Sequence, residues 1–154
     1  MGEGELFEAA KNGYAMYGAL AKQLMLKHGA AMVYEAVASM GEAAGRGSGE
    51  RLKLGLDKFA SQLLESQLVG GWRSEVMVEG NRVVLKNHIC PCYSGMRAGG
   101  LSHDEARKMC YSWWARFPDN ARRVNPCVKD YWIEHYRSPE ADYCLEVFEV
   151  REKS

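Results

Sequence analysis

Residues 72–92 read WRSEVMVEGNRVVLKNHICPC and decide the fold class. Residues 72–79 and 82–89 are rich in β-branched side chains and flank Gly80-Asn81, a pair that is typical of a two-residue hairpin turn. The second predicted strand runs directly into Cys90-Pro91-Cys92. The stretch therefore predicts a β-hairpin with a cysteine motif at one end.

Helices are predicted before this hairpin. Apolar residues recur every three or four positions over residues 5–27, 30–44 and 50–68. The glycine-rich segment 45–49 is expected to connect the second and third helices. It follows a helix rather than a strand and lacks a Gly-Lys-Ser/Thr sequence, so we interpret it as a plain connector rather than a phosphate loop.

The chain after the hairpin mixes helix and strand. Residues 93–101 contain three glycines and are expected to form a loop. A capping box of Ser102 and Glu105 starts a fourth helix, which should end before Pro118. Asn125-Pro126 predicts a fifth helix over residues 126–136, and residues 143–150 predict a last strand.

These elements predict a single α+β domain spanning residues 1–154. Three N-terminal helices, in a half covering residues 1–70, are expected to pack with a small antiparallel sheet and two further helices in a cysteine-bearing half covering residues 71–154.

Composition narrows the classes of function. The chain has 154 residues, 47% of them hydrophobic and 26% charged, which is typical of a globular domain. Twenty basic residues balance twenty acidic ones, which argues against nucleic acid or an anionic membrane as partner. No apolar run is long enough to span a membrane, and the acidic N-terminus does not resemble a secretory signal. We expect a cytoplasmic protein that binds a small molecule.

Five cysteines, all in the second half, are the unusual feature. An odd number cannot all pair within one chain, and in a reducing compartment they act as thiols, nucleophiles or metal ligands. They are Cys90, Cys92, Cys110, Cys127 and Cys144.

The segment 88–92 is one candidate site. If it is extended, His88, Cys90 and Cys92 point to the same side and offer three donors for zinc or iron. Cys110 and Cys144 are the further candidate ligands. The alternative is that the two cysteines are simply buried and the histidine lies on the surface.

Cys127 and Asp130 form a second candidate site. Near the N-terminus of the predicted fifth helix, the pKa of a thiol falls, and residues three apart share a helix face. In the alternative interpretation, Asp130 is a solvated acid that suits the helix dipole. His103 and His135 are possible bases.

Aromatic and methionine side chains suggest apolar binding surfaces. Six aromatic residues crowd the second half and are candidates to line a ligand pocket, although core packing is their default role; they are Tyr111, Trp113, Trp114, Tyr131, Trp132 and Tyr136. Four methionines on the first two helices suggest a homodimer face or a ligand cavity, with ordinary core as the default; they are Met16, Met25, Met32 and Met40.

Three motifs resemble the L-2-amino-thiazoline-4-carboxylic acid hydrolase family. A strand ends in Cys90-Pro91, a later Cys-x-x-Asp is formed by Cys127 and Asp130, and the last strand opens with Asp142-Tyr143-Cys144 and apolar residues. The chain departs from the family in the residues before the last strand and in its extra Cys92 and Cys110. A weaker resemblance links it to small-molecule-sensing domains of the four-vinyl-reductase type, which hold zinc through cysteines.

The hydrolase resemblance implies ring opening of a cyclic amidine. It implies Cys127 or Cys90 as nucleophile or ligand and Asp130 as acid, base or orienting group. Arg97 or Arg137 would hold the substrate carboxylate, and Trp132 belongs to the candidate pocket. The second resemblance implies instead a binding module without catalysis, with zinc or iron on the cysteines.

Overall fold

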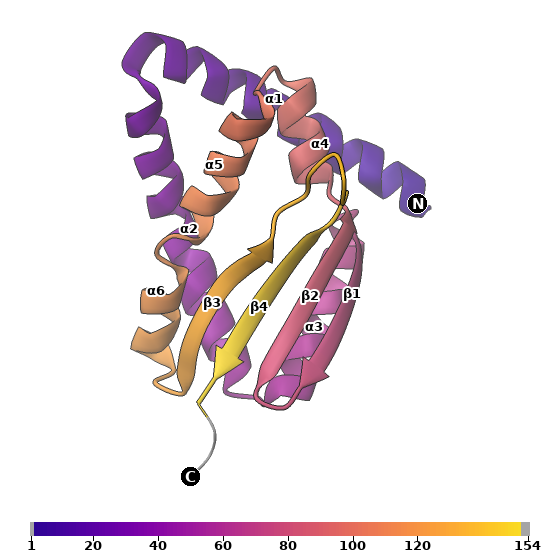
Figure 1. Cartoon of the computed structure of the whole chain (residues 1–154), viewed down its shortest axis with the longest axis vertical. Coiled ribbons are helices and arrows are strands. Elements are labelled where there is room, and N and C mark those ends of the chain that lie inside the picture. Colours follow the sequence, from indigo (N-terminus) through magenta and orange to yellow (C-terminus); the bar gives the residue numbers. More distant parts are fainter. Residues whose placement is uncertain (1, 152–154) are drawn as a thin grey trace.

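A computed structural model describes residues 2–151 and confirms the α+β class (Figure 1). The helices are α1 (Glu3–His28), α2 (Ala30–Leu52), α3 (Leu56–Val69), α4 (Pro91–Ala98), α5 (His103–Trp114) and α6 (Phe117–Val124). The strands are β1 (Arg73–Glu79), β2 (Arg82–Ile89), β3 (Val128–His135) and β4 (Cys144–Val150). The predicted hairpin, the capping box at Ser102 and the last strand are confirmed.

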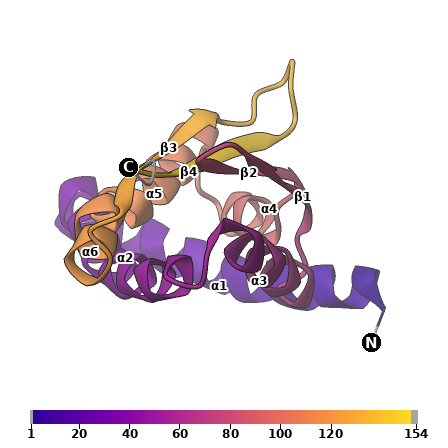
Figure 2. The same ribbon diagram turned by 90° about the horizontal axis from the view of Figure 1, so that it is seen from below.

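The four strands form one antiparallel sheet in the order β1-β2-β4-β3. Leu85 pairs with Glu146 and Asn87 pairs with Cys144, so these inward-facing positions of β2 and β4 lie side by side. Figure 2 shows that the helices lie on one side of the sheet. One face of the sheet therefore meets the helical layer, and the site lies between the two.

The predicted connector over residues 45–49 is wrong, because α2 continues through it to Leu52. Gly41, Gly45 and Gly49 lie four residues apart on one face of α2, against α5 and α6. A Cβ on Gly45 would lie 2.8 Å from the Phe117 carbonyl oxygen. The glycines permit close helix packing rather than a turn, and α3 consequently starts at Leu56, six residues later than predicted.

The predicted loop over residues 93–101 is also largely wrong, because α4 occupies most of it. Pro91 stands at the first helical position, where its missing N–H costs nothing. The glycines again mark a close contact: a Cβ on Gly95 or Gly99 would overlap backbone atoms of α1.

The predicted fifth helix is wrong, because residues 128–135 form strand β3. Val128, Tyr131, Trp132 and Ile133 favour a strand, and β3 pairs with β4 along its length. Asn125 does not cap a helix: its Oδ1 accepts the Cys127 N–H at 3.1 Å, and its Nδ2 donates to the Gly49 carbonyl oxygen. The helix that the sequence did not predict is α6, which precedes this turn.

Two apolar clusters flank the site. One joins the sheet to α3 and α6 through Phe59, Phe117 and Phe148. The other joins α1, α2, α4 and α5 through Val37, Met96 and other buried side chains. None of the helices within residues 2–151 combines the length and apolar character needed to cross a bilayer.

The methionines of the first two helices divide between core and surface. Met25 is buried, whereas Met16, Met32 and Met40 are exposed. The homodimer stays a prediction.

Alanine scanning of the α2 glycines tests the packing argument. Gly41→Ala should destabilise the protein by about 3 kcal/mol or more, because its Cβ would overlap the Trp113 carbonyl oxygen. Gly47→Ala, on the same helix with no atom within 4 Å of its Cβ, should stabilise by about 0.5–1 kcal/mol. Urea denaturation measures both, and equal effects would contradict the close approach of α2 and α5.

Candidate functional site

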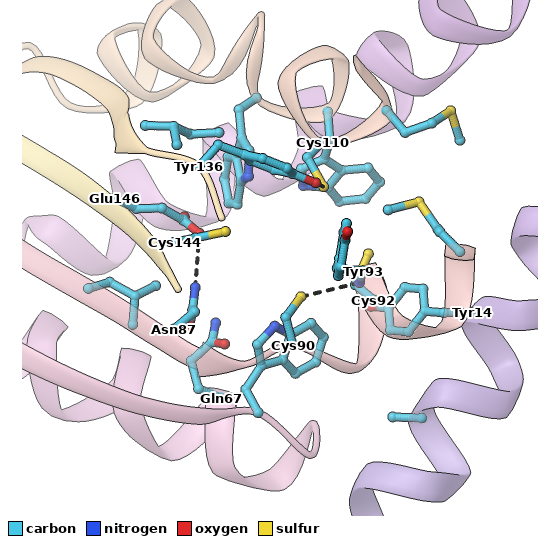
Figure 3. A pocket seen from close by; sticks show the side chains of 18 of the residues that line it. Tyr14, Gln67, Asn87, Cys90, Cys92, Tyr93, Cys110, Tyr136, Cys144 and Glu146 are labelled. Atoms are coloured by element: carbon cyan, nitrogen blue, oxygen red, sulfur yellow. Dashed lines mark hydrogen bonds between the residues drawn. The ribbon is translucent and has the colours of Figure 1, made fainter. Parts of the chain in front are cut away.

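A cavity of about 610 Å³ lies between the sheet and the helical layer. Its walls come from every helix except α6, from β2, β3 and β4, and from short segments beside them. Most of the lining side chains are apolar or aromatic, and four of the five cysteines line it. Figure 3 shows these cysteines around one space: Cys90, Cys92, Cys110 and Cys144.

Cys90 occupies the N-cap of α4. Its sulfur accepts the Tyr93 backbone N–H at 3.3 Å, and the N-terminal end of a helix favours negative charge. The hydrogen bond from Cys92, the Tyr93 N–H and the charge of Arg137 lower the pKa of Cys90 from 9.0 to about 7, although burial opposes them. Cys90 is therefore the thiol that the fold activates.

Two other cavity thiols, those of Cys92 and Cys144, have raised pKa values. Hydrogen bonds with Cys110 and Cys90, together with burial, raise the pKa of Cys92. The Tyr136 hydroxyl extends this chain of contacts to Cys110, with 3.7 Å between oxygen and sulfur. Burial raises the pKa of Cys144 to about 11 despite the neighbouring Arg137. The pKa values of Cys92 and Cys144 are thus shifted in the opposite direction from that of Cys90.

A buried carboxyl faces the same cavity. Glu146 of β4 accepts hydrogen bonds from Asn87 Nδ2 at 2.9 Å and from the Tyr131 hydroxyl at 2.8 Å. Burial raises the pKa of Glu146, although these two bonds lower it. A carboxyl in this environment suits a general acid.

Arg137 supplies positive charge from behind the cavity wall. Its guanidinium lies 5.0 Å from the centre of the Tyr93 ring, and it donates to the Asn87 carbonyl oxygen at 3.3 Å and to Asp142 at 2.9 Å. It does not line the cavity. Its charge supports the Cys90 thiolate without reaching a ligand in the cavity.

The predicted pair Cys127 and Asp130 lies elsewhere. Both residues are exposed, and the helix that was to join them is a strand. The carboxylate of Asp130 accepts the Tyr131 backbone N–H at 2.8 Å. Cys127 lines a second hollow beside the hairpin turn rather than the cavity with the other cysteines. The argument for an activated thiol at a helix start therefore applies to Cys90 instead of Cys127.

The other predicted contacts also lie outside the cavity. Arg97 donates to the Leu101 carbonyl oxygen, and Trp132 packs under Arg82 on the opposite face of the sheet. His103 contacts the Tyr93 hydroxyl at 3.0 Å, and His135 contacts the Ala141 carbonyl oxygen at 3.2 Å. Of the six aromatic candidates, Trp113, Trp114 and Tyr136 line the cavity.

The described side chains do not fit a zinc or iron site. His88 turns away to Glu75, with 3.0 Å between Nε2 and Oε1, and Cys92 lies inside α4 rather than on an extended segment. Within residues 2–151, no group of three or more His, Cys, Asp or Glu side chains is arranged to hold a metal ion. The metal expectation is not confirmed, and no chemistry below depends on it.

Three polar residues of the site were not predicted from the sequence. They are Gln67, Asn87 and Glu146. The alternation of the last strand carried a signal for Glu146, because it places residues 144, 146 and 148 on one face. The apolar residues 145 and 147 made the choice of inner face ambiguous. Gln67 and Asn87 carry no local signal.

Comparison of the chain with protein-family models, with curated proteins and with solved structures gave no match. The hydrolase resemblance stays a prediction from short motifs.

Alkylation of Cys90 tests its activation. In a Cys127→Ser background, the rate of Cys90 modification by iodoacetamide should rise with pH around a midpoint of about 7, because the thiolate is the reactive form. Mass spectrometry of the Cys90 peptide measures the rate. Cys92→Ala should move the midpoint upward, because Cys92 supplies the largest stabilising contact. An ordinary thiol midpoint in the parent protein would contradict the assignment.

The pH dependence of stability tests Glu146. The folded-state pKa is raised, so the folded protein binds the proton more tightly and loses stability as pH rises through that pKa. Glu146→Gln removes this ionisation and can keep both hydrogen-bond contacts. We therefore expect urea denaturation to show a larger free energy of unfolding for the variant, relative to the parent protein, at pH 8 than at pH 5. A difference that is constant with pH would count against a raised pKa.

Proposed function

We propose that this protein is a cysteine-dependent hydrolase that opens the ring of a cyclic amidine or a similar carbon–nitrogen or carbon–sulfur bond. The observation that carries the proposal is that one cavity contains two ionisable groups whose pKa values are shifted in opposite directions. Cys90 has a lowered pKa and Glu146 has a raised pKa. A thiolate and a carboxylic acid in one apolar cavity form a nucleophile and an acid pair.

The first half of the reaction forms a covalent adduct. The Cys90 thiolate attacks the amidine carbon, and the C=N electron pair moves to nitrogen. When the C=N bond re-forms, the ring bond from carbon to sulfur or to the second nitrogen breaks. The departing ring atom takes the electron pair and then the proton of Glu146, so that Cys90 stays bonded to carbon and Glu146 becomes a carboxylate.

Water completes the cycle. It attacks the same carbon, the C=N electron pair moves to nitrogen, and the Glu146 carboxylate accepts one of the water protons. The bond from Cys90 to carbon then breaks, and its electron pair returns to the thiolate. The carbon keeps the water oxygen, and the product exceeds the substrate by one water. Both protein groups regain their starting protonation states.

A second function is favoured by the predominantly apolar cavity wall. Such a cavity suits a ligand-binding module in which the thiols do no chemistry. The two proposals differ in whether bound cyclic amidines are consumed.

Turnover assays separate the two functions. The protein is incubated with 2-amino-2-thiazoline and with its 4-carboxylate, and mass spectrometry follows the gain of one water. Cys90→Ser should lose at least about a thousandfold in turnover because the nucleophile is replaced. Glu146→Gln should lose about a hundredfold because the acid is removed.

Cys127→Ser is the matched control, since it makes the same change on an exposed cysteine outside the cavity and should leave turnover unchanged. Full activity of Cys90→Ser would sink the mechanism. Binding without turnover in the parent protein would favour the ligand-binding module.

A further inference from the structure

An amide without a partner lines the cavity. Gln67 of α3 extends into it next to Asn87 (Figure 3). Its Oε1 is buried and has no hydrogen-bond partner among the residues that the structure describes. Burying an amide without a partner is unfavourable, so a ligand that supplies an N–H to this oxygen compensates for the burial.

The described cavity lining lacks a cationic side chain. In the described part of the chain, its lining includes no lysine, arginine or histidine. Of the two arginines in the predicted site, Arg97 bonds to the Leu101 carbonyl oxygen. Arg137 lies behind the cavity wall, where it bonds to Asp142 and to the Asn87 carbonyl oxygen, and its buried Nε has no partner among the described residues. A ligand carboxylate would be buried in this cavity without a described cationic side chain in contact with it, which is strongly unfavourable.

The aromatic character of the walls favours a flat ring. Aromatic side chains line the cavity from several elements, among them Tyr14, Trp72 and Trp113. Tyr14 and Trp72 meet edge to face with ring centres 5.8 Å apart. Aromatic walls pack well against planar rings, and about 610 Å³ is in the range of pockets for ligands larger than a single small ring.

We propose that the substrates of this site are uncharged, planar nitrogen heterocycles without a carboxylate, and that Gln67 recognises an N–H beside their reacting carbon. The inference rests on the proposed function for the position of that carbon at Cys90. It departs from the carboxylated substrate that the hydrolase resemblance implies. Gln67 is thereby a specificity-determining residue.

The test measures binding without turnover. Calorimetry on the Cys90→Ala protein compares three probes: 2-aminobenzothiazole, 2-methylbenzothiazole and 2-aminobenzothiazole-6-carboxylate. The first is a planar cyclic amidine, the second lacks the exocyclic N–H, and the third adds a carboxylate. The first should bind about tenfold more tightly than either of the others. Compared with the methyl compound it makes one more hydrogen bond, and compared with the carboxylate it buries no charge.

Variants on α3 assign the effect to one residue. Gln67→Leu should weaken binding of 2-aminobenzothiazole about tenfold and leave 2-methylbenzothiazole unweakened. Gln62→Leu is the matched control: Gln62 also has a buried Oε1 without a partner, but it does not line the cavity. It should change neither affinity.

Several outcomes would overturn the inference. They are equal affinity for the carboxylate probe, no preference for the amino over the methyl compound, an equal loss for both in Gln67→Leu, or no binding of any probe. The comparison of probes needs no Gln67 variant, so it holds if Gln67→Leu fails to fold. Because Cys90 is absent from the protein tested, failure here is distinct from failure of the hydrolase proposal, which the parent protein's alkylation and turnover decide.

Discussion

Strand β2 passes into helix α4 with no loop between them, and the site depends on this junction. Pro91 occupies the first helical position, and Cys90 caps the helix through the Tyr93 N–H. The sheet layer and the helical layer are thereby joined at one residue. Because α4 then packs closely on α1 through Gly95 and Gly99, the direction of the helix start is set, and the Cys90 sulfur lies in the gap between the two layers.

Two ionisable groups in this gap, Cys90 and Glu146, have pKa values that are shifted in opposite directions. The helix start and nearby donors lower the pKa of Cys90, whereas burial raises the pKa of Glu146. Asn87 links the two sides, since its side chain bonds Glu146 and its carbonyl oxygen accepts from Arg137.

Local sequence signals predicted the elements that depend on local chemistry. The Gly80-Asn81 turn with its β-branched flanks, the Ser102 capping box and the alternating last strand all form as expected. The failures share a cause. Glycine clusters suggest turns when considered locally, but here they allow close contact of α2 with α5 and α6 and of α4 with α1. Asn125-Pro126 suggests a helix start, but pairing with β4 makes the next segment a strand.

For the candidate site too, some features follow from the sequence and others only from the tertiary structure. The amino-acid sequence alone established the α+β class and the concentration of thiols in one half of the chain. It also allowed us to apply the general principle that a helix start lowers the pKa of a thiol. Applied to an assumed helix, that rule selected Cys127; applied to the folded protein, it selects Cys90. Which cysteines meet depends on β2 and β4 being neighbours in the sheet, although Asn87 and Cys144 lie far apart in sequence. Tertiary structure alone decided the site, because pKa shifts and cavity walls arise from contacts between such distant residues.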